Sequence, residues 1–287
     1  MTRPFYLSDE ALSQFIKSAL VEDIGEGDHS SNAAIPENLT AKAQLLIKSE
    51  GIIAGLEVAE KIFRAFDKNL IVTFKKKDGD PVSLGEVAFV VQGPARSILS
   101  TERLVLNCMQ RMSGIATYTH RLSKLVEGTS AQLMDTRKTT PNFRLLEKWA
   151  VLIGGGLNHR YALYDMVMLK DNHIDMAGGV RNAINNTKKY LKSNNKNLKI
   201  EVETRTLAEV KEVLDTGGVD VIMLDNMSPE QMKEAVALIN GRCKCEASGG
   251  ITESTLRKVA ECGVDFISVG ALTHSVKSLD LSLKVFQ

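Results

Sequence analysis

The chain has 287 residues, of which 44% are hydrophobic and 25% are charged, a composition typical of globular proteins. Its 36 Lys and Arg residues nearly balance the 35 Asp and Glu residues, and the net charge of +1 argues against a generally basic nucleic-acid or membrane surface. The sequence shows no signal-peptide core, no run of membrane-spanning length and no C-x-x-C pair among its four cysteines, so we expect a cytoplasmic protein with neither nucleic acid nor membrane as a partner.

The first part of the chain is predicted to form a small α+β domain. The expected elements are, in chain order, a helix over 8–21, a strand-forming stretch over 41–55, a helix over 56–67, strands over 82–93 and a long helix over 95–114. Ser8 is a suitable N-cap for the first helix, and Gly114 is a suitable stop for the last. We therefore predict an N-terminal α+β domain over 1–113, on which the C-terminal tail 275–287 packs.

From residue 114 to residue 274, short apolar strands alternate with amphipathic helices. The strand-like segments are 131–135, 166–170, 199–203, 219–225, 244–248 and 264–270. Repeated strand–helix units force parallel strands with right-handed crossovers. We predict an α/β barrel, complete or incomplete (open). A doubly wound open sheet is the alternative, and it is disfavoured because no G-x-G-x-x-G motif opens a helix.

Polar residues recur where these strands end. The strand ends carry Arg137 and Lys138, then Lys170, Glu203 and Asp225, and finally Ser248-Gly249-Gly250 and Gly270. In a barrel the carboxyl ends of the strands lie at one face, so these groups are expected to converge on one site. Glu201 and Glu203 leave their strand on the same side, and a buried acidic pair needs a cation or a metal as partner.

Each residue alone also has an ordinary structural use. A single lysine such as Lys170 is usually a solvated loop residue, and a lone histidine such as His159 is usually buried and satisfied by the fold. Asp225 could cap the next helix, but Ser228 is better placed for that. Together with Arg160, however, the cations and the glycine-rich turns that bind phosphate through backbone N–H groups imply a polyanionic substrate.

The chemistry predicted from these residues is metal-assisted. Paired carboxylates beside phosphate sites favour Mg²⁺, which is usually held by one or two carboxylates and the substrate's phosphates. The group contains neither a Ser-His-Asp nor a Cys-His set, so we expect no covalent nucleophile. The residues therefore predict an enzyme acting on a small, highly anionic phosphate ester.

Several motifs together resemble the quinolinate phosphoribosyltransferase family. They are, in order, "TRKTTP", "GGGLNHR", "MLKDNHI", "IEVET", "LDNM", "EASGGI" and "ISVGALTHS", with "EDIGEGDHSS", "GIIAGLEVAEKIF" and "TERLVLNCMQRMSGIAT" in the N-terminal half. The resemblance covers nearly the whole chain. It departs mildly from the family at Asn142-Phe143, where Gly-Leu is more usual, and at Ala162, where Gly is frequent.

This resemblance implies an N-terminal α/β domain followed by an open α/β barrel. The implied reaction joins quinolinate to phosphoribosyl pyrophosphate with Mg²⁺ and yields nicotinate mononucleotide, pyrophosphate and CO₂, as a step of NAD biosynthesis. The implied assembly is a homodimer or a hexamer built from dimers.

The resemblance also implies roles for individual residues. Quinolinate would be bound by Arg137, Lys138, His159, Arg160 and Lys170, with Arg103 contributed across the interface by the neighbouring subunit. Glu203 and Asp225 would handle the ribose and hold the metal, and Ser248, Gly249, Gly250 and Gly270 would bind phosphate. Lys138, Lys170, Glu203 and Asp225 are the residues expected to be catalytic.

Two other functions compete with this interpretation. One is a related phosphoribosyltransferase with a different base, including the molybdenum-associated relatives, although the full set of basic residues argues against a base with little charge. The other is a non-catalytic barrel that senses a nucleotide. Retention of both Glu203 and Asp225 argues against that, because binding alone needs no acidic pair near phosphates.

Overall fold

A computed structural model describes residues 3–286 and divides the chain into two compact units. The first unit contains the chain up to His120, the segment Lys138–Gly155 and the chain from Ala271 onward. The second contains Arg121–Arg137 and Gly156–Gly270. Lys138–Gly155 therefore belongs to the same compact unit as the N-terminal residues, although it lies within the range 114–274 predicted for the barrel.

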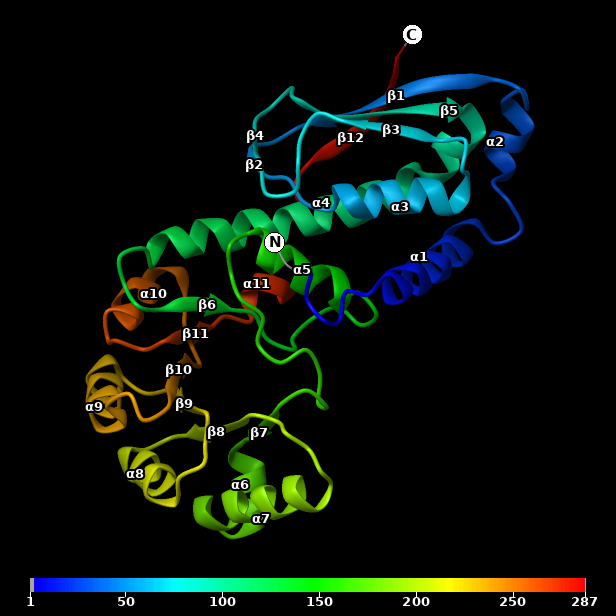
Figure 1. Ribbon diagram of the computed structural model, residues 1–287. Coiled ribbons are helices and arrows are strands. Elements are labelled where there is room, and N and C mark those ends of the chain that lie inside the picture. Colours follow the sequence, from blue (N-terminus) through cyan, green and yellow to red (C-terminus); the bar gives the residue numbers. More distant parts are fainter. Residues whose placement is uncertain (1–2, 287) are drawn as a thin grey trace. The chain divides into compact units, whose positions relative to one another are not determined.

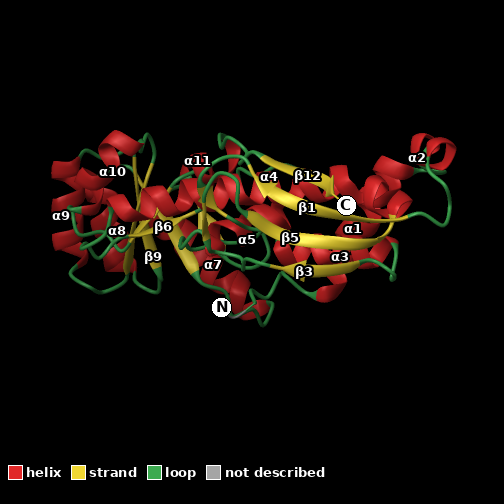
Figure 2. Ribbon diagram, turned by 90° about the horizontal axis from the view of Figure 1, so that it is seen from above, coloured by secondary structure: helices red, strands yellow, loops and turns green. Residues whose placement is uncertain are grey.

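The first unit is built on a four-stranded antiparallel sheet with the order β12-β1-β5-β3 (Figure 1). The strands are β1 (Thr40–Ile47), β3 (Ile71–Phe74), β5 (Val87–Pro94) and β12 (Leu281–Phe286), and a separate two-stranded ribbon joins β2 (Gly51–Ile52) to β4 (Pro81–Val82). The helices are α1 (Asp9–Ile24), α2 (His29–Ala34), α3 (Leu56–Phe66), α4 (Ala95–Leu125), α5 (Arg144–Ile153) and α11 (Ala271–His274). Helices α3 and α4 lie along one face of the sheet (Figures 1 and 2).

Local sequence explains how this unit begins and how its sheet is completed. Helix α1 has the predicted N-cap, because the Ser8 hydroxyl accepts a hydrogen bond from the Ala11 N–H at 3.0 Å. The end of the chain supplies β12, which pairs antiparallel with β1 and sets Leu283 opposite Leu45, both buried. The tail is thus held by apolar burial and by a full ladder of backbone hydrogen bonds.

The prediction that the long helix stops at Gly114 is wrong, because α4 continues to Leu125. Gly114 lies inside the helix, where a Cβ atom would collide with the Lys277 carbonyl oxygen and would lie 3.0 Å from the Ser278 Cα. The glycine therefore allows the chain segment leading into β12 to pass directly against the helix. Close approach of two backbones, rather than helix termination, is its use.

The second unit is built on a six-stranded sheet with the order β6-β11-β10-β9-β8-β7, in which every recorded pairing is parallel. Its strands are β6 (Gln132–Met134), β7 (Val167–Leu169), β8 (Ile200–Thr204), β9 (Val221–Asp225), β10 (Lys244–Ser248) and β11 (Phe266–Ser268). Its helices are α6 (Asp171–Ala177), α7 (Val180–Ser193), α8 (Leu207–Thr216), α9 (Pro229–Ile239) and α10 (Glu253–Ala260). All six predicted strands are present.

This sheet curves, with α8, α9 and α10 on its outer side (Figure 1). Within residues 3–286 the two end strands, β6 and β7, do not pair with each other, so the barrel is open. The predicted fold, an open α/β barrel with an N-terminal α+β domain, is thereby confirmed. No described helix has the length and apolar character needed to cross a membrane.

Candidate active site

Three predicted site residues of the second unit lie at one edge of its sheet. Asp225 is paired with Ser248 across β9 and β10, and Glu203 is paired with Met223, two residues before Asp225, across β8 and β9. Because these strands are parallel neighbours, their last residues share the carboxyl edge of the sheet. This is the edge at which α/β barrels bind and transform their ligands.

Glu203 and Asp225 form an acidic pair at this edge. Burial, and next the negative charge of Asp225, raise the pKa of Glu203, while the positive charge of Lys170 opposes the rise. Two carboxylates that repel each other in a partly buried position are stabilised by a cation between them. Their chemistry fits Mg²⁺, which prefers carboxylate and phosphate oxygens.

Asp225 is held in place by its neighbours on two strands. The Asn226 side-chain amide donates a hydrogen bond of 2.8 Å to Asp225 Oδ2, and the Asn226 backbone N–H donates one of 2.9 Å to the Ser248 carbonyl. Gly249, with φ of +88°, packs directly against Asn226, so that a Cβ atom there would lie 2.5 Å from Asn226 Cγ. Ser228 caps α9, as predicted, so Asp225 is not needed as the cap of that helix.

The second unit also carries three predicted basic site residues, Arg137, Arg160 and Lys170. Lys170 directly follows β7 and is exposed, and its backbone N–H donates a hydrogen bond of 3.0 Å to His173 Nδ1 at the start of α6. Arg160 is half-buried, and its guanidinium donates to the Met166 carbonyl at 3.2 Å. Burial, and next the positive charge of Arg137, lower the pKa of Arg160. The negative charges of Glu201 and Asp165 oppose this shift, so Arg160 lies among charges of both signs.

His159 is engaged by the protein through both of its ring nitrogens. Its Nδ1 accepts a hydrogen bond of 2.7 Å from the Arg160 backbone N–H, so the neutral ring carries its proton on Nε2. That nitrogen lies 2.9 Å from Glu201 Oε2 and 3.5 Å from Glu246 Oε2. The partner of buried Glu201 in the structure is thus His159, which was also predicted to contact quinolinate.

Two buried glutamates, Glu201 and Glu246, lie beside His159. Burial raises the pKa of Glu201 to about 7, and burial and the charge of Glu201 raise the pKa of Glu246 to about 8. The pair therefore keeps a proton near neutral pH. The ligand atoms of the three side chains lie within 4.8 Å of one another, so this cluster could also hold a metal ion.

Asp135, which directly follows β6, does not present its charge to solvent. It is fully buried and accepts hydrogen bonds from the Asn158 side chain at 2.6 Å and from the His159 backbone N–H at 2.9 Å. These bonds fold the segment 156–160 against β6, beside the parallel bridge between Met134 and Leu157. Asp135 therefore shapes the segment that carries Arg160.

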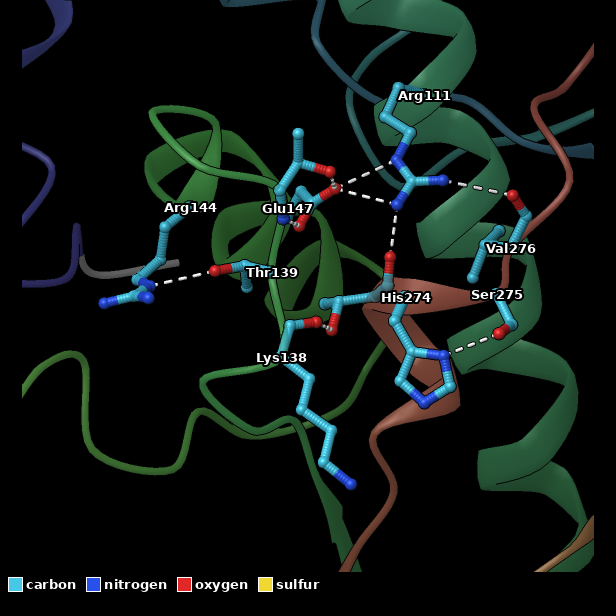
Figure 3. Close-up of polar contacts among 10 residues, drawn as sticks. Arg111, Lys138, Thr139, Arg144, Glu147, His274, Ser275 and Val276 are labelled. Carbon is cyan, nitrogen blue, oxygen red and sulfur yellow. Dashed lines mark hydrogen bonds and ion pairs between the residues drawn. The ribbon is translucent and has the colours of Figure 1, made fainter.

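Two predicted site residues, Lys138 and Arg103, belong to the first unit. Lys138 is exposed, and its backbone carbonyl accepts a hydrogen bond of 2.8 Å from the Thr273 hydroxyl (Figure 3). Arg103 is exposed on α4 and forms no ion pair within residues 3–286. Gly270 is the last residue of the second unit and follows β11.

The sequence analysis missed three kinds of contributor. Glu246 was overlooked because it lies inside an apolar strand, although a glutamate at that place is itself a signal of a buried partner. Asn226 has a positive φ of 55°, which its place after a strand-end aspartate could have suggested. Arg111 lies on the predicted helix over 95–114, whereas Glu147 lies on α5, which was not predicted, and only the structure brings the two together.

The sequence matches two family models, described as quinolinate phosphoribosyl transferase, C-terminal domain (residues 115–284) and N-terminal domain (residues 28–113). It is 49% identical over 289 residues to a nicotinate-nucleotide pyrophosphorylase [carboxylating], chloroplastic, of Arabidopsis thaliana, covering 96% of this chain and 82% of that one. It is 43% identical to a probable nicotinate-nucleotide pyrophosphorylase [carboxylating] of Bacillus subtilis, covering 96% and 93%. The crystal structure of NadC from Streptococcus pyogenes superposes with a TM-score of 0.92 at 40% identity and covers 100% of each chain.

Proposed function

Because the chain belongs to the quinolinate phosphoribosyltransferase family, we propose that it transfers the phosphoribosyl group of phosphoribosyl pyrophosphate to quinolinate with loss of CO₂. The products are nicotinate mononucleotide and pyrophosphate, and the reaction serves NAD biosynthesis. The main support for the proposal is that Lys170 lies near the Glu203–Asp225 pair at the carboxyl edge of one parallel sheet.

The basic residues bind the dicarboxylate. Arg137 and Arg160 offer planar guanidinium groups suited to bidentate pairing with carboxylates, and the repulsion between them is relieved when an anion binds. Lys170 adds a positive charge from the end of β7. On the family's pattern, Lys138 and His159 also contact quinolinate, with His159 held in one orientation by Arg160 and Glu201.

The acidic pair and the glycine-rich turn serve the phosphoribosyl donor. Glu203 and Asp225 bind the ribose and hold Mg²⁺ together with the donor's phosphates. When bound there, Mg²⁺ supplies positive charge that neutralises the leaving pyrophosphate. Ser248, Gly249, Gly250 and Gly270 bind phosphate, which fits the positive φ of +88° and +61° at Gly249 and Gly250.

The bond changes need no covalent enzyme intermediate. The quinolinate ring nitrogen forms a bond to the anomeric carbon of the ribose as the bond from that carbon to pyrophosphate breaks, and the nearby carboxylates stabilise the positive charge on the ribose. The glycosylated ring nitrogen is cationic, so it stabilises the carbanion left when the adjacent carboxylate departs as CO₂, and that carbon then takes a proton from water to give nicotinate mononucleotide. Lys138, Lys170, Glu203 and Asp225 are the residues we assign to catalysis.

The assembly is a homodimer or a hexamer built from dimers, and Arg103 of one subunit binds quinolinate held by the other. The exposure of Arg103, with no ion pair within residues 3–286, supports a role outside its own subunit. A cytoplasmic location stays a prediction from composition, since plant relatives are named chloroplastic or mitochondrial.

Pyrophosphate release with quinolinate or nicotinate as acceptor tests the function. Nicotinate lacks one carboxylate and would lose the hydrogen bonds that this group makes to the basic residues; each charged hydrogen bond lost costs about 1.5–3 kcal/mol, so two should lower kcat/KM by several powers of ten. Equal turnover of the two acids would reject quinolinate as the substrate. Asp225→Asn should weaken calorimetric binding of Mg²⁺-phosphoribosyl pyrophosphate and spare quinolinate, and the reverse result would refute the assignment of Asp225.

A further inference from the structure

A buried ion pair in the first unit is joined to the segment that carries Lys138 (Figure 3). Arg111 of α4 donates two hydrogen bonds to Glu147 Oε1 of α5, from Nε at 3.0 Å and from Nη2 at 2.8 Å. Glu147 is fully buried, and the Arg111 side chain is only 22% exposed. Removing such a pair from water costs free energy unless further hydrogen bonds satisfy both groups. The partners of those hydrogen bonds therefore indicate what the pair is used for.

The remaining hydrogen bonds of Glu147 go to Thr140. Its Oε2 accepts the Thr140 backbone N–H at 2.9 Å, and its Oε1 accepts the Thr140 hydroxyl at 3.0 Å. The two preceding residues are held as well. The Thr139 hydroxyl accepts a bond of 2.9 Å from Arg144 Nε, and the Lys138 carbonyl accepts one of 2.8 Å from the Thr273 hydroxyl. Hydrogen bonds thus hold three successive loop residues, Lys138, Thr139 and Thr140, in place.

Arg111 also ties this loop to α11 and to the residues that follow it. Its guanidinium donates to the Val276 carbonyl at 3.1 Å and to the Thr273 carbonyl. Thr273 is therefore held through its carbonyl by Arg111 while its hydroxyl holds Lys138. The network closes on itself, because Arg111 reaches the loop by two routes, one through Glu147 and Thr140 and one through Thr273.

The Lys138 side chain extends away from this network (Figure 3). Its ammonium group carries the charge used in binding, whereas the network acts on its backbone and on the two residues after it. The arrangement fixes the base of a long flexible side chain and leaves its end to reach a ligand. Such support is what holds a charged group in a productive place.

We propose that Arg111 and Glu147 are positioning residues for Lys138 in quinolinate binding, an inference that rests on the function proposed above. They act through Thr140 and Thr273 and do not touch the substrate. Apolar side chains could fill the same buried volume at a lower cost in free energy. Positioning of Lys138 explains why an ion pair is present instead.

The test is a double-mutant cycle with quinolinate affinity as the readout. Glu147→Gln keeps the shape of the side chain and removes its charge, and it should raise the quinolinate Kd by about tenfold or more, as expected when a charged hydrogen bond is lost. The Kd for phosphoribosyl pyrophosphate should change by less than about twofold, since that ligand is held by other residues. In a Lys138→Met background the same substitution should have almost no further effect on quinolinate, because its action runs through Lys138.

The control is Glu86→Gln, which breaks the Lys76–Glu86 ion pair of 2.8 Å elsewhere in the first unit. It should leave both dissociation constants unchanged. If Glu147→Gln does not fold, Thr140→Val and Thr140→Ser replace it: valine loses the hydroxyl that donates to Glu147, serine keeps it, and only the serine variant should retain wild-type quinolinate affinity. Additive losses in the cycle, or equal losses for both ligands, would overturn the inference. If instead the wild-type protein fails to convert quinolinate, it is the proposed function that fails.

Discussion

Gly249→Ala is the substitution for which the structure makes the sharpest prediction. Gly249 has φ of +88°, a conformation that costs an L-residue about 1–2 kcal/mol. The added Cβ atom would also lie 2.5 Å from Asn226 Cγ and 2.8 Å from Asn226 Nδ2, so that side chain must move. Asn226 donates the 2.8 Å hydrogen bond to Asp225, and its displacement releases the proposed ligand of Mg²⁺ and ribose.

The two costs can be separated with a matched glycine. Gly241 has φ of +72° and open space around its Cβ position, so Gly241→Ala carries the backbone cost alone. Both variants should lose a similar free energy of unfolding from backbone strain, about 1–2 kcal/mol. Only Gly249→Ala should raise the KM for phosphoribosyl pyrophosphate, by about tenfold or more, because a charged hydrogen bond worth about 1.5–3 kcal/mol is lost.

The assay is pyrophosphate release at saturating quinolinate, with thermal unfolding measured on the same samples. In an Asn226→Gly background the side chain that blocks the new Cβ atom is gone, so Gly249→Ala should then cost no more than Gly241→Ala does. If Gly249→Ala raises this KM equally in both backgrounds, the collision with Asn226 is not the cause. If Gly249→Ala has the same kinetics as Gly241→Ala in the wild-type background, the proposed link from Gly249 through Asn226 to Asp225 is refuted.

Features that depend on neighbours in sequence were predictable. The alternation of apolar strands and amphipathic helices fixed the parallel sheet, since that pattern allows few other topologies. Ser8 and Ser228 were recognised as N-caps because a cap acts on residues two or three positions away. Likewise, Glu203, Asp225 and Ser248 could be placed at one sheet edge from their strand-end positions alone.

Features that depend on contacts across the chain were not predictable. Gly114 carries the local signal of a helix stop, but what decides its use is the backbone at Lys277, far along the sequence. The partner of Glu201 is His159, on a loop of another strand–helix unit, and Arg111 meets Glu147 from another helix. Asn142, by contrast, explains a family departure directly: its φ is +60°, a conformation that glycine adopts freely and asparagine tolerates.

The remaining predictions concern a cap, a lysine and the subunit interface. Burial raises the pKa of Asp78, whose carboxylate accepts the Leu56 N–H at 2.9 Å, from 3.8 to about 6, so its ionisation costs stability as the pH rises from 4 to 6. The free energy of unfolding of Asp78→Asn, measured by denaturant titration, should therefore rise relative to that of the wild type over that range, by at most about 3 kcal/mol. A parallel pH dependence of the two proteins would contradict this. Lys170→Met should abolish turnover with an unchanged or raised melting temperature, because it relieves repulsion among cations; a large drop in melting temperature with normal activity would make the lysine structural. Arg103→Ala and Lys170→Ala should each be nearly inactive as homodimers. If Arg103 completes the partner's site, a mixed dimer of these two variants collects both lesions in one site and none in the other, so co-refolding should restore up to about half of the sites in each mixed dimer. Mixed dimers that form, as shown by two distinguishable tags, yet stay inactive would show that Arg103 does not act across the interface.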